Sequence, residues 1–295
     1  MSFKKTLTSL VLAGAMAIGG LTEKLKADNW AVIDNPWASE TFASNISNNE
    51  VVGCWGPGAT QGFSYNRLTN SWNVLNKPGF TSYSQIDSID DGHVVGRYMD
   101  DSGSHGFVYE NGNWTSLDMP GVSSTEVHDM DGINILGAGY QGKWYGFLYD
   151  GVNWNPIDKP GASSTQPTGI SGNKIVGGYD SGLSFLYDGT NWTELNMPGA
   201  KSTHACAIDG DDIGGFYYDS IGKMHGFLYD GVNWKSIDAP NATTRTVVSG
   251  INGDDIVGYY GDASGYHGFV YTIPEPATIG LLSLGVLALS RKRKK

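Results

Sequence analysis

The chain is built from copies of one pattern, and the spacing of these copies restricts its fold more than any other feature. Each copy contains a tryptophan preceded by Asn or Ser, at Trp30, Trp72, Trp114, Trp154, Trp192 and Trp234. Successive tryptophans are 42, 42, 40, 38 and 42 residues apart. Periods near 40 residues with strand-like content are typical of β-propellers and related repeat arrays. The repetition therefore favours a propeller over a globular enzyme of unique sequence.

Each copy contains four segments of strand length. The first segment ends at Ile or Met, and the second reads Val-Val-Gly or Ile-Val-Gly in four of the copies. The third carries Gly-Phe, as at 267–269, and the fourth is the Trp segment, as at 234–238. Asp-Gly pairs between the third and fourth segments favour tight hairpins, because they tolerate the positive φ that such turns need. Four antiparallel strands per copy are the content of one propeller blade.

The phase of the repeat predicts how the propeller closes. The first copy is a lone fourth strand at Trp30–Asp34, and the last copy stops after a third strand at Gly268–Tyr271. If these two strands pair, they complete a sixth blade and leave no open sheet edge that invites association. We therefore predict an all-β fold over residues 28–272. It is a six-bladed β-propeller of four-stranded blades, monomeric and closed by the N- and C-terminal strands.

The N-terminal segment has the composition of a signal peptide. Lys4 and Lys5 precede an apolar stretch from Leu7 to Leu21. Small residues that suit cleavage lie within this stretch at 15–17 and after it at 25–27. We predict a signal peptide over residues 1–27, and an uncleaved membrane anchor is the alternative.

The C-terminal segment, residues 273–295, combines three parts. Pro274, Glu275 and Pro276 precede an apolar run from Ile279 to Leu289, which is shorter than the roughly 20 residues of a bilayer-spanning helix. Five basic residues then end the chain in a stop-transfer arrangement. A plain hydrophobic tail anchor is one interpretation of this segment.

Motif, apolar run and basic end in this order resemble the PEP-CTERM sorting signal of Gram-negative bacteria. The resemblance implies export by the general secretory route and recognition by an exosortase-type sorting enzyme in the inner membrane. Pro274, Glu275 and Pro276 would be the sorting motif, and the C-terminal segment would anchor the chain transiently. Delivery to the cell surface or to an exopolysaccharide matrix is also implied.

The repeats themselves resemble the HAF family of bacterial extracellular repeats. Gly-Phe-Leu-Tyr-Asp-Gly and Ile-Val-Gly-Tyr carry this resemblance over residues 29–271, with His-Gly-Phe where the family name expects His-Ala-Phe. It implies an extracellular propeller-like protein and supplies no catalytic residues.

The charge of the repeat region excludes one class of partner. Residues 28–290 hold ten basic and 29 acidic residues, a net charge of −19. Such a surface repels phosphate backbones, so we expect no nucleic-acid binding.

Variable polar positions in the first, innermost strand are the candidate ligand site. They lie two or four residues before the conserved Ile or Met of each copy, and the rest of the repeat is uniform. We predict ligand-binding residues at the channel mouth: Asp87, Glu126, His128, Gln166 and His204. The alternative is that they only line a water-filled channel. Asp87 and Glu126, from adjacent copies, are the best pair for glycosidase chemistry, which needs two acids about 5 to 9.5 Å apart.

Other chemistry-bearing residues fit structural roles better. His105, His225 and His267 occupy equivalent places in separate blades, so we expect no shared metal. Asp-Gly-Asp-Asp turns have oxygen ligands for Ca²⁺, but none matches the full calcium loop. Solvated turns are therefore favoured, and no cofactor is expected. Cys54 and Cys206 lie in non-adjacent copies, which disfavours a disulfide.

Motifs for nucleophilic catalysis, zinc hydrolysis and phosphate binding are absent from the sequence. We therefore expect a non-enzymatic protein that binds an extracellular polysaccharide or a surface protein, or that serves structurally. The alternative is a secreted glycan-cleaving hydrolase or lyase that acts at the channel mouth.

Overall fold

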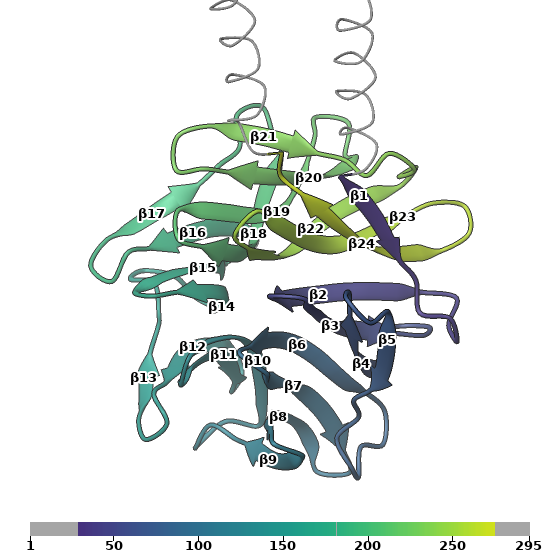
Figure 1. Ribbon diagram of the computed structural model, residues 1–295. Helices are drawn as coiled ribbons and strands as arrows, with labels where there is room; N and C mark the ends of the chain where they lie inside the picture. Colours follow the sequence, from purple (N-terminus) through teal and green to yellow (C-terminus); the bar gives the residue numbers. More distant parts are fainter. Residues whose placement is uncertain (1–28, 181, 275–295) are drawn as a thin grey trace, which may run out of the picture. The chain divides into compact units, whose positions relative to one another are not determined.

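The computed structural model describes residues 29–180 and 182–274. The predicted signal peptide at 1–27, together with Glu275 and Pro276 of the sorting motif, lies outside these ranges. The described residues form 24 strands in six four-stranded antiparallel sheets, as Figure 1 shows. No helix within these ranges is long and apolar enough to cross a membrane. The prediction of an all-β, six-bladed propeller is confirmed.

Five blades are formed by consecutive strands, blade 1 by β2–β5 and blade 5 by β18–β21. The innermost strands are β2 (Thr41–Ser47), β6 (Ser84–Asp90), β10 (Ser124–Asp131), β14 (Thr165–Ser171), β18 (Ser202–Asp209) and β22 (Arg245–Asn252). The second strands are β3 (Glu50–Trp55), β7 (His93–Asp100), β11 (Asn134–Tyr140), β15 (Lys174–Tyr179), β19 (Asp212–Tyr218) and β23 (Asp255–Gly261). The third strands are β4 (Gln61–Asn66), β8 (Gly103–Glu110), β12 (Trp144–Tyr149), β16 (Leu183–Tyr187), β20 (Met224–Tyr229) and β24 (Tyr266–Thr272). The outermost strands are β5 (Ser71–Val74), β9 (Asn113–Leu117), β13 (Trp154–Pro156), β17 (Trp192–Leu195), β21 (Trp234–Ile237) and β1 (Trp30–Ile33).

Blade 6 takes its strands from both ends of the chain. Its order is β1-β24-β23-β22, so the first strand of the chain lies beside the last. The ring of Trp30 packs on that of Tyr271 with centroids 4.7 Å apart, and the Thr272 N–H donates to the Asn29 carbonyl at 3.0 Å. This strand order agrees with the closure that the repeat phase predicts.

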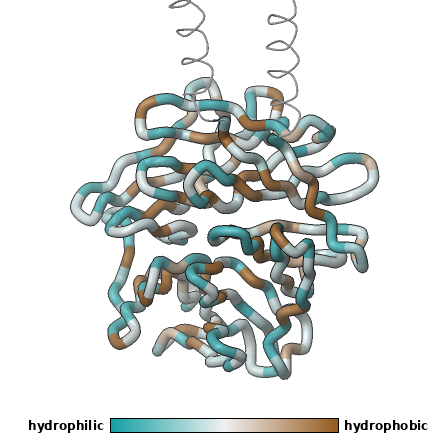
Figure 2. The backbone as a smooth tube through the Cα atoms, viewed as in Figure 1, coloured by the Kyte–Doolittle hydropathy of each residue, from teal (hydrophilic) through white to brown (hydrophobic). Residues whose placement is uncertain are grey.

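Each blade buries one phenylalanine from its third strand. These six residues are 0 to 1% exposed and are Phe63, Phe107, Phe147, Phe185, Phe227 and Phe269. Hydrophobic segments recur along the strands and alternate with hydrophilic turns, as Figure 2 shows. Burying a phenylalanine stabilises a fold by about 1.5–3 kcal/mol, so the Gly-Phe repeat supplies one core anchor per blade.

A close backbone contact explains the glycine of each second strand. At Gly258 an added Cβ would lie 1.9 Å from the Val247 carbonyl oxygen, and the same approach recurs in every blade at 1.9 to 2.4 Å. The contact sits at a β-bulge in the innermost strand, such as the one between Val248 and Gly250. The bulge inserts one extra residue, and in all six blades that residue is the variable position two before the Ile or Met.

A buried hydroxyl ties each preceding loop to the start of an innermost strand. It accepts a backbone N–H at 2.7 to 3.1 Å and is 0 to 2% exposed in all six blades. The six residues are Thr41, Ser84, Thr125, Thr165, Thr203 and Thr246. We call the side of the propeller at which the innermost strands begin the start face.

Side-chain acceptors join the blades on the opposite side, which we call the turn face. The residue after each conserved Ile or Met accepts an N–H from the next blade at 2.5 to 3.3 Å. The acceptors are Ser47, Asp90, Asp131, Ser171, Asp209 and Asn252. Every donor residue has a positive φ between 43° and 60°, which Gly, Asn and Asp tolerate best. The six bonds form one closed ring that includes the joint between blades 6 and 1.

The hydroxyl anchors give a direct test of the fold. Thr165→Val keeps the side-chain shape but leaves the part-buried Lys159 N–H without its acceptor. We expect a loss of about 1–3 kcal/mol in the free energy of unfolding, measured by chemical denaturation. Thr193→Val on the exposed face of β17 is the matched control and should change the stability by less than about 0.5 kcal/mol. Equal effects of the two changes would contradict the anchoring role.

Candidate functional site

The bulge residues converge on the inside of the propeller. Five of the six, Asp87, His128, Thr168, Cys206 and Ser249, line a cavity of about 20 Å³. A cavity of roughly 10–15 Å³ is enough for one water molecule, so this space suits a single water and not a sugar. The buried atoms Asp87 Oδ2 and His128 Nε2 have no hydrogen-bond partner within the protein. Both residues therefore face the channel interior, as the sequence predicts, but the cavity beside them is too small to hold a sugar.

Arg97 organises the charged groups at the joint of blades 2 and 3. Its Nη1 donates to Glu126 Oε2 at 2.9 Å, and its Nη2 lies 3.6 Å from Asp87 Oδ1. Its Nε donates to Gln85 Oε1 at 2.8 Å. The guanidinium thus lies between the two carboxylates that the sequence pairs, and its bonds to protein groups fix it there.

Burial dominates the titration of this cluster. It raises the pKa of Asp87 to about 6, although the nearby Arg97 acts in the opposite direction. Burial, together with the positive charge of Arg97, lowers the pKa of His128 to about 3. At neutral pH His128 is therefore uncharged, and it is not a proton donor for an acid–base mechanism.

The other two predicted residues do not join this cluster. His204 stacks on Phe216 with centroids 4.6 Å apart and planes 10° from parallel, and burial lowers the pKa of His204. Gln166 lies on β14 opposite Gly178, in blade 4. This blade separates the Arg97 cluster of blades 2 and 3 from His204 in blade 5. The five predicted residues therefore lie at two repeat positions in four different blades and do not form one compact site.

Aromatic rings gather at the start face, where sequence reasoning did not look for them. Phe42 lies 5.1 Å from Tyr259 and 5.1 Å from Tyr266, at the joint of blades 6 and 1. Phe216 and Tyr218 of blade 5 pack edge to face beside His204. Arg97, Phe216 and Tyr259 all sit opposite the variable position four before the Ile or Met. The variation among copies at this second-strand position was the sequence signal that could have identified these residues.

A second cavity, of about 110 Å³, opens at the turn face. It is lined by residues of the acceptor ring and by Asp129. Asp129 is 8% exposed and accepts from Ser88 Oγ at 2.6 Å, from Asn45 Nδ2 at 3.2 Å and from the Ile170 N–H at 2.8 Å. Burial raises the pKa of Asp129 to about 6, and these hydrogen bonds limit the rise. Asp129 therefore connects four blades around the channel.

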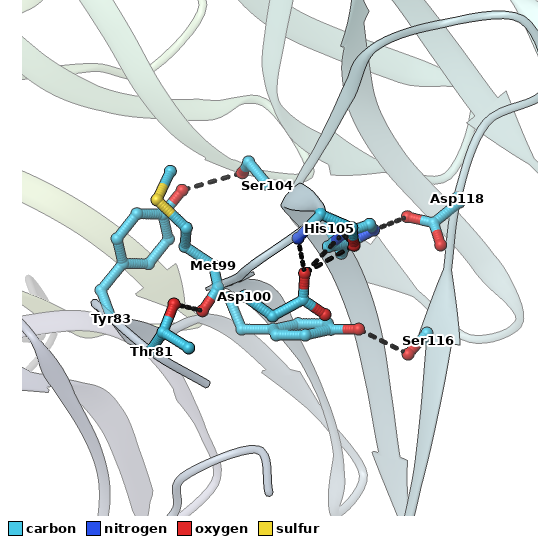
Figure 3. A network of polar contacts seen from close by, with 10 residues as sticks. Thr81, Tyr83, Met99, Asp100, Ser104, His105, Ser116 and Asp118 are labelled. Carbon is cyan, nitrogen blue, oxygen red and sulfur yellow. Dashed lines mark hydrogen bonds and ion pairs between the residues drawn. The ribbon is translucent and has the colours of Figure 1, made fainter. Parts of the chain in front are cut away.

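The repeated histidines are held between carboxylates. In blade 2, His105 Nδ1 contacts Asp118 at 2.8 Å and Nε2 contacts Asp100 at 3.2 Å, as Figure 3 shows. His225 has the same arrangement in blade 5. In blade 6, burial opposes protonation of His267, but the bonds and charges of Asp34 and Asp262 prevail and raise its pKa. Each histidine thus links its third strand to the segment that follows the outermost strand.

Residues 29–180 and 182–274 contain neither a metal-binding cluster nor a disulfide. No three His, Cys, Asp or Glu side chains come together there in a way that would hold a metal ion. Cys54 and Cys206 lie in blades 1 and 5 and are free, and burial raises the pKa of each thiol to about 12. Neither thiol is a reactive nucleophile in this state.

Comparison with known proteins identifies the C-terminal segment. Residues 272–294 match the PEP-CTERM protein-sorting motif, which confirms the predicted sorting signal. The motif is recognised by exosortase and implies an exported protein with transient membrane anchoring. No curated protein sequence matches the chain. The HAF-type character of the repeats stays a prediction.

Solved structures with a similar fold have diverse activities. The β-propeller domain of the Trilobed protease from Pyrococcus furiosus, described as having an open velcro topology, is 9% identical with a TM-score of 0.51. That alignment covers 79% of this chain and 95% of that domain. A lectin from Aleuria aurantia in complex with Fucα1-6GlcNAc is 11% identical over 81% of this chain and 97% of its own, with a TM-score of 0.49. A Trypanosoma rangeli sialidase in complex with sialic acid is 10% identical over 90% and 60%, with a TM-score of 0.45. At such identities the likeness shows the fold alone.

The buried carboxylate Asp129 predicts an unusual pH dependence of stability. Its pKa of about 6 in the folded state lies above the unfolded value of 3.8. Its favourable contribution is therefore complete below about pH 4 and is lost as the pH rises through 6. We expect wild type to gain about 1–3 kcal/mol relative to Asp129→Asn between pH 7 and pH 4.5, measured by urea denaturation. The exposed change Asp101→Asn should show no such trend, and parallel curves for wild type and Asp129→Asn would refute the assignment.

Proposed function

We propose that the protein is an exported, non-catalytic β-propeller that binds an extracellular glycan at its start face. The observation that carries this proposal is the position of Arg97 between Asp87 and Glu126. A paired-carboxylate glycosidase needs a free acid on either side of the scissile bond. Here a substrate would have to displace a guanidinium that also bonds to Gln85.

The aromatic rings of the start face support a binding role. Phe42, Tyr259 and Tyr266 are partly exposed, and so are Phe216 and Tyr218 of blade 5. Aromatic side chains offer flat apolar faces, and tyrosine adds a polar hydroxyl, which together suit a sugar ring. Ligand sites commonly combine such aromatic walls with a few polar groups that fix orientation.

The sorting motif supports the location that we propose. It implies export, and we infer that an exosortase-type enzyme of a Gram-negative bacterium processes the chain near Pro274. The propeller would then be displayed on the cell surface or in the exopolysaccharide matrix. A binding module for polysaccharide suits that environment, and a surface protein is the other partner that it would meet there.

Binding and turnover can be measured on the same sample. The full-length chain, purified in mild detergent, should bind at least one polysaccharide of a panel and should not shorten it over a day. Glu126→Gln should retain that binding, because Glu126 is committed to Arg97. Polysaccharide shortening by wild type that Glu126→Gln abolishes would instead establish a hydrolase or lyase at Asp87, Glu126, His128 or His204. Absence of both binding and turnover would overturn the proposal in favour of a scaffold.

A further inference from the structure

Arg245 differs from the other arginines of the propeller. Residues 28–290 contain three arginines, and two of them face carboxylates. Arg67 pairs with Asp255 at 2.5 Å, and Arg97 pairs with Glu126 at 2.9 Å. Arg245 forms no ion pair within residues 29–180 and 182–274. The domain has a net charge of −19, so carboxylates are plentiful. An arginine that pairs with none of the described carboxylates is therefore unusual.

Aromatic rings surround Arg245 in place of carboxylates. Its guanidinium lies over the ring of Tyr266, 5.4 Å from the centroid, which is within the range of a cation–π contact. Tyr266 is 5.1 Å from Phe42 and 6.0 Å from Tyr259. All four residues are partly exposed. We call Phe42, Arg245, Tyr259 and Tyr266 the blade 6–1 patch.

The patch offers hydrogen-bond donors as well as flat rings. Burial raises the pKa of Tyr259 to about 12, so its hydroxyl stays protonated at physiological pH. The guanidinium carries five N–H groups in a fixed plane that matches the two oxygens of a carboxylate. Positive charge, donors and apolar ring faces therefore occur together at one blade joint.

Positive charge is also concentrated on this side of the propeller. Seven of the ten basic residues between 28 and 290 lie on the start face or near it, given the strand directions: Lys77, Arg97, Lys143, Lys159, Lys201, Lys223 and Arg245. At the turn face, Arg67 and Lys174 are both paired with aspartates. Glu40 Cγ lies 3.7 Å from the place of a Cβ on Gly265, and Glu40 forms no ion pair with Arg245. Among the described residues, a ligand carboxylate can therefore pair with Arg245 without displacing a carboxylate of the protein.

We propose that the blade 6–1 patch binds a carboxylate-bearing pyranose of an acidic polysaccharide. The carboxylate pairs with Arg245, and the sugar ring lies against Tyr266. This inference rests on the proposed glycan binding at the start face and names the class of its ligand. A bidentate arginine–carboxylate pair gives both strength and orientation, which a neutral sugar would lack.

The test compares each acidic polysaccharide with its own neutral form. Polygalacturonate, alginate and hyaluronate, and the carboxyl-reduced form of each, are titrated into the full-length chain in mild detergent. Wild type should bind at least one acidic form about tenfold to a hundredfold more tightly than its reduced form, as expected for a hydrogen bond to a charged group. Arg245→Gln should remove this preference. Arg67→Gln removes the same charge at the turn face and should keep it.

Tyr266 gives an independent measurement. Tyr266→Phe should retain the preference, whereas Tyr266→Ala should weaken binding of the acidic and the reduced forms alike by about tenfold. Thermal unfolding midpoints identify any variant that fails to fold, and Arg245→Lys then replaces Arg245→Gln as a milder change that keeps charge but loses the bidentate geometry.

Three results would overturn the inference. The first is that Arg245→Gln retains the full preference, and the second is that dextran sulfate binds wild type as tightly as the best uronate polymer. The third is that wild type binds neutral polysaccharides with no preference for acidic ones, which rejects the ligand class and leaves the proposed function standing. If wild type binds no polysaccharide of any kind, the proposed function falls together with the inference.

Discussion

Every blade depends on one close approach between two strands. The carbonyl oxygen before each bulge of the innermost strand occupies the place where a second-strand Cβ would be, so only glycine fits opposite it. In blades 2 to 6 the same glycine also leaves room for the buried phenylalanine of the third strand, whose ring lies 2.7 to 3.0 Å from the missing Cβ. The bulge then turns one extra residue toward the channel. The backbone contact is uniform, whereas the bulge residue varies: it is Ser in blades 1 and 6 and a different residue in each of the other four.

The interior of the channel and its start face therefore have separate roles. Inside, Thr168 donates to the Ala205 carbonyl of the next blade, and Asp129 accepts from Ser88 and from the Ile170 N–H. The cavity that the bulge residues line has room for little more than one water. At the start face, the second strands add Arg97, Phe216 and Tyr259 beside the variable first-strand positions. Recognition on such a surface combines residues of adjacent blades. A ligand on this face would bind at the joint between two blades and not inside the channel.

The sequence was sufficient for the fold because each copy repeats the same local instructions. Gly258, Phe269 and the acceptor after Ile251 have counterparts at fixed spacing in every blade, and the phase of Trp30 shows where the ring closes. The site was harder to predict, because the partners of a variable residue lie in another copy. Glu126 is variable and polar as expected, but its partner Arg97 reaches it from the second strand of the preceding blade. The contact between Arg97 and Glu126 depends on how far one arginine side chain extends. The spacing of residues along the chain does not show this.

The strand order of blade 6 means that this blade is complete only when both β1 and β24 are present. A chain that crosses a membrane from its N-terminus delivers β1 first and β24 last, and these are the two strands that must meet. Blades 1 to 5 take all of their strands from the chain between β1 and β22, so blade 6 is the one of the six described sheets that needs both ends of the domain. The match to the sorting motif covers residues 272–294 and so begins at Thr272, the last residue of β24. The strand that completes blade 6 and the signal that directs sorting are therefore contiguous along the chain.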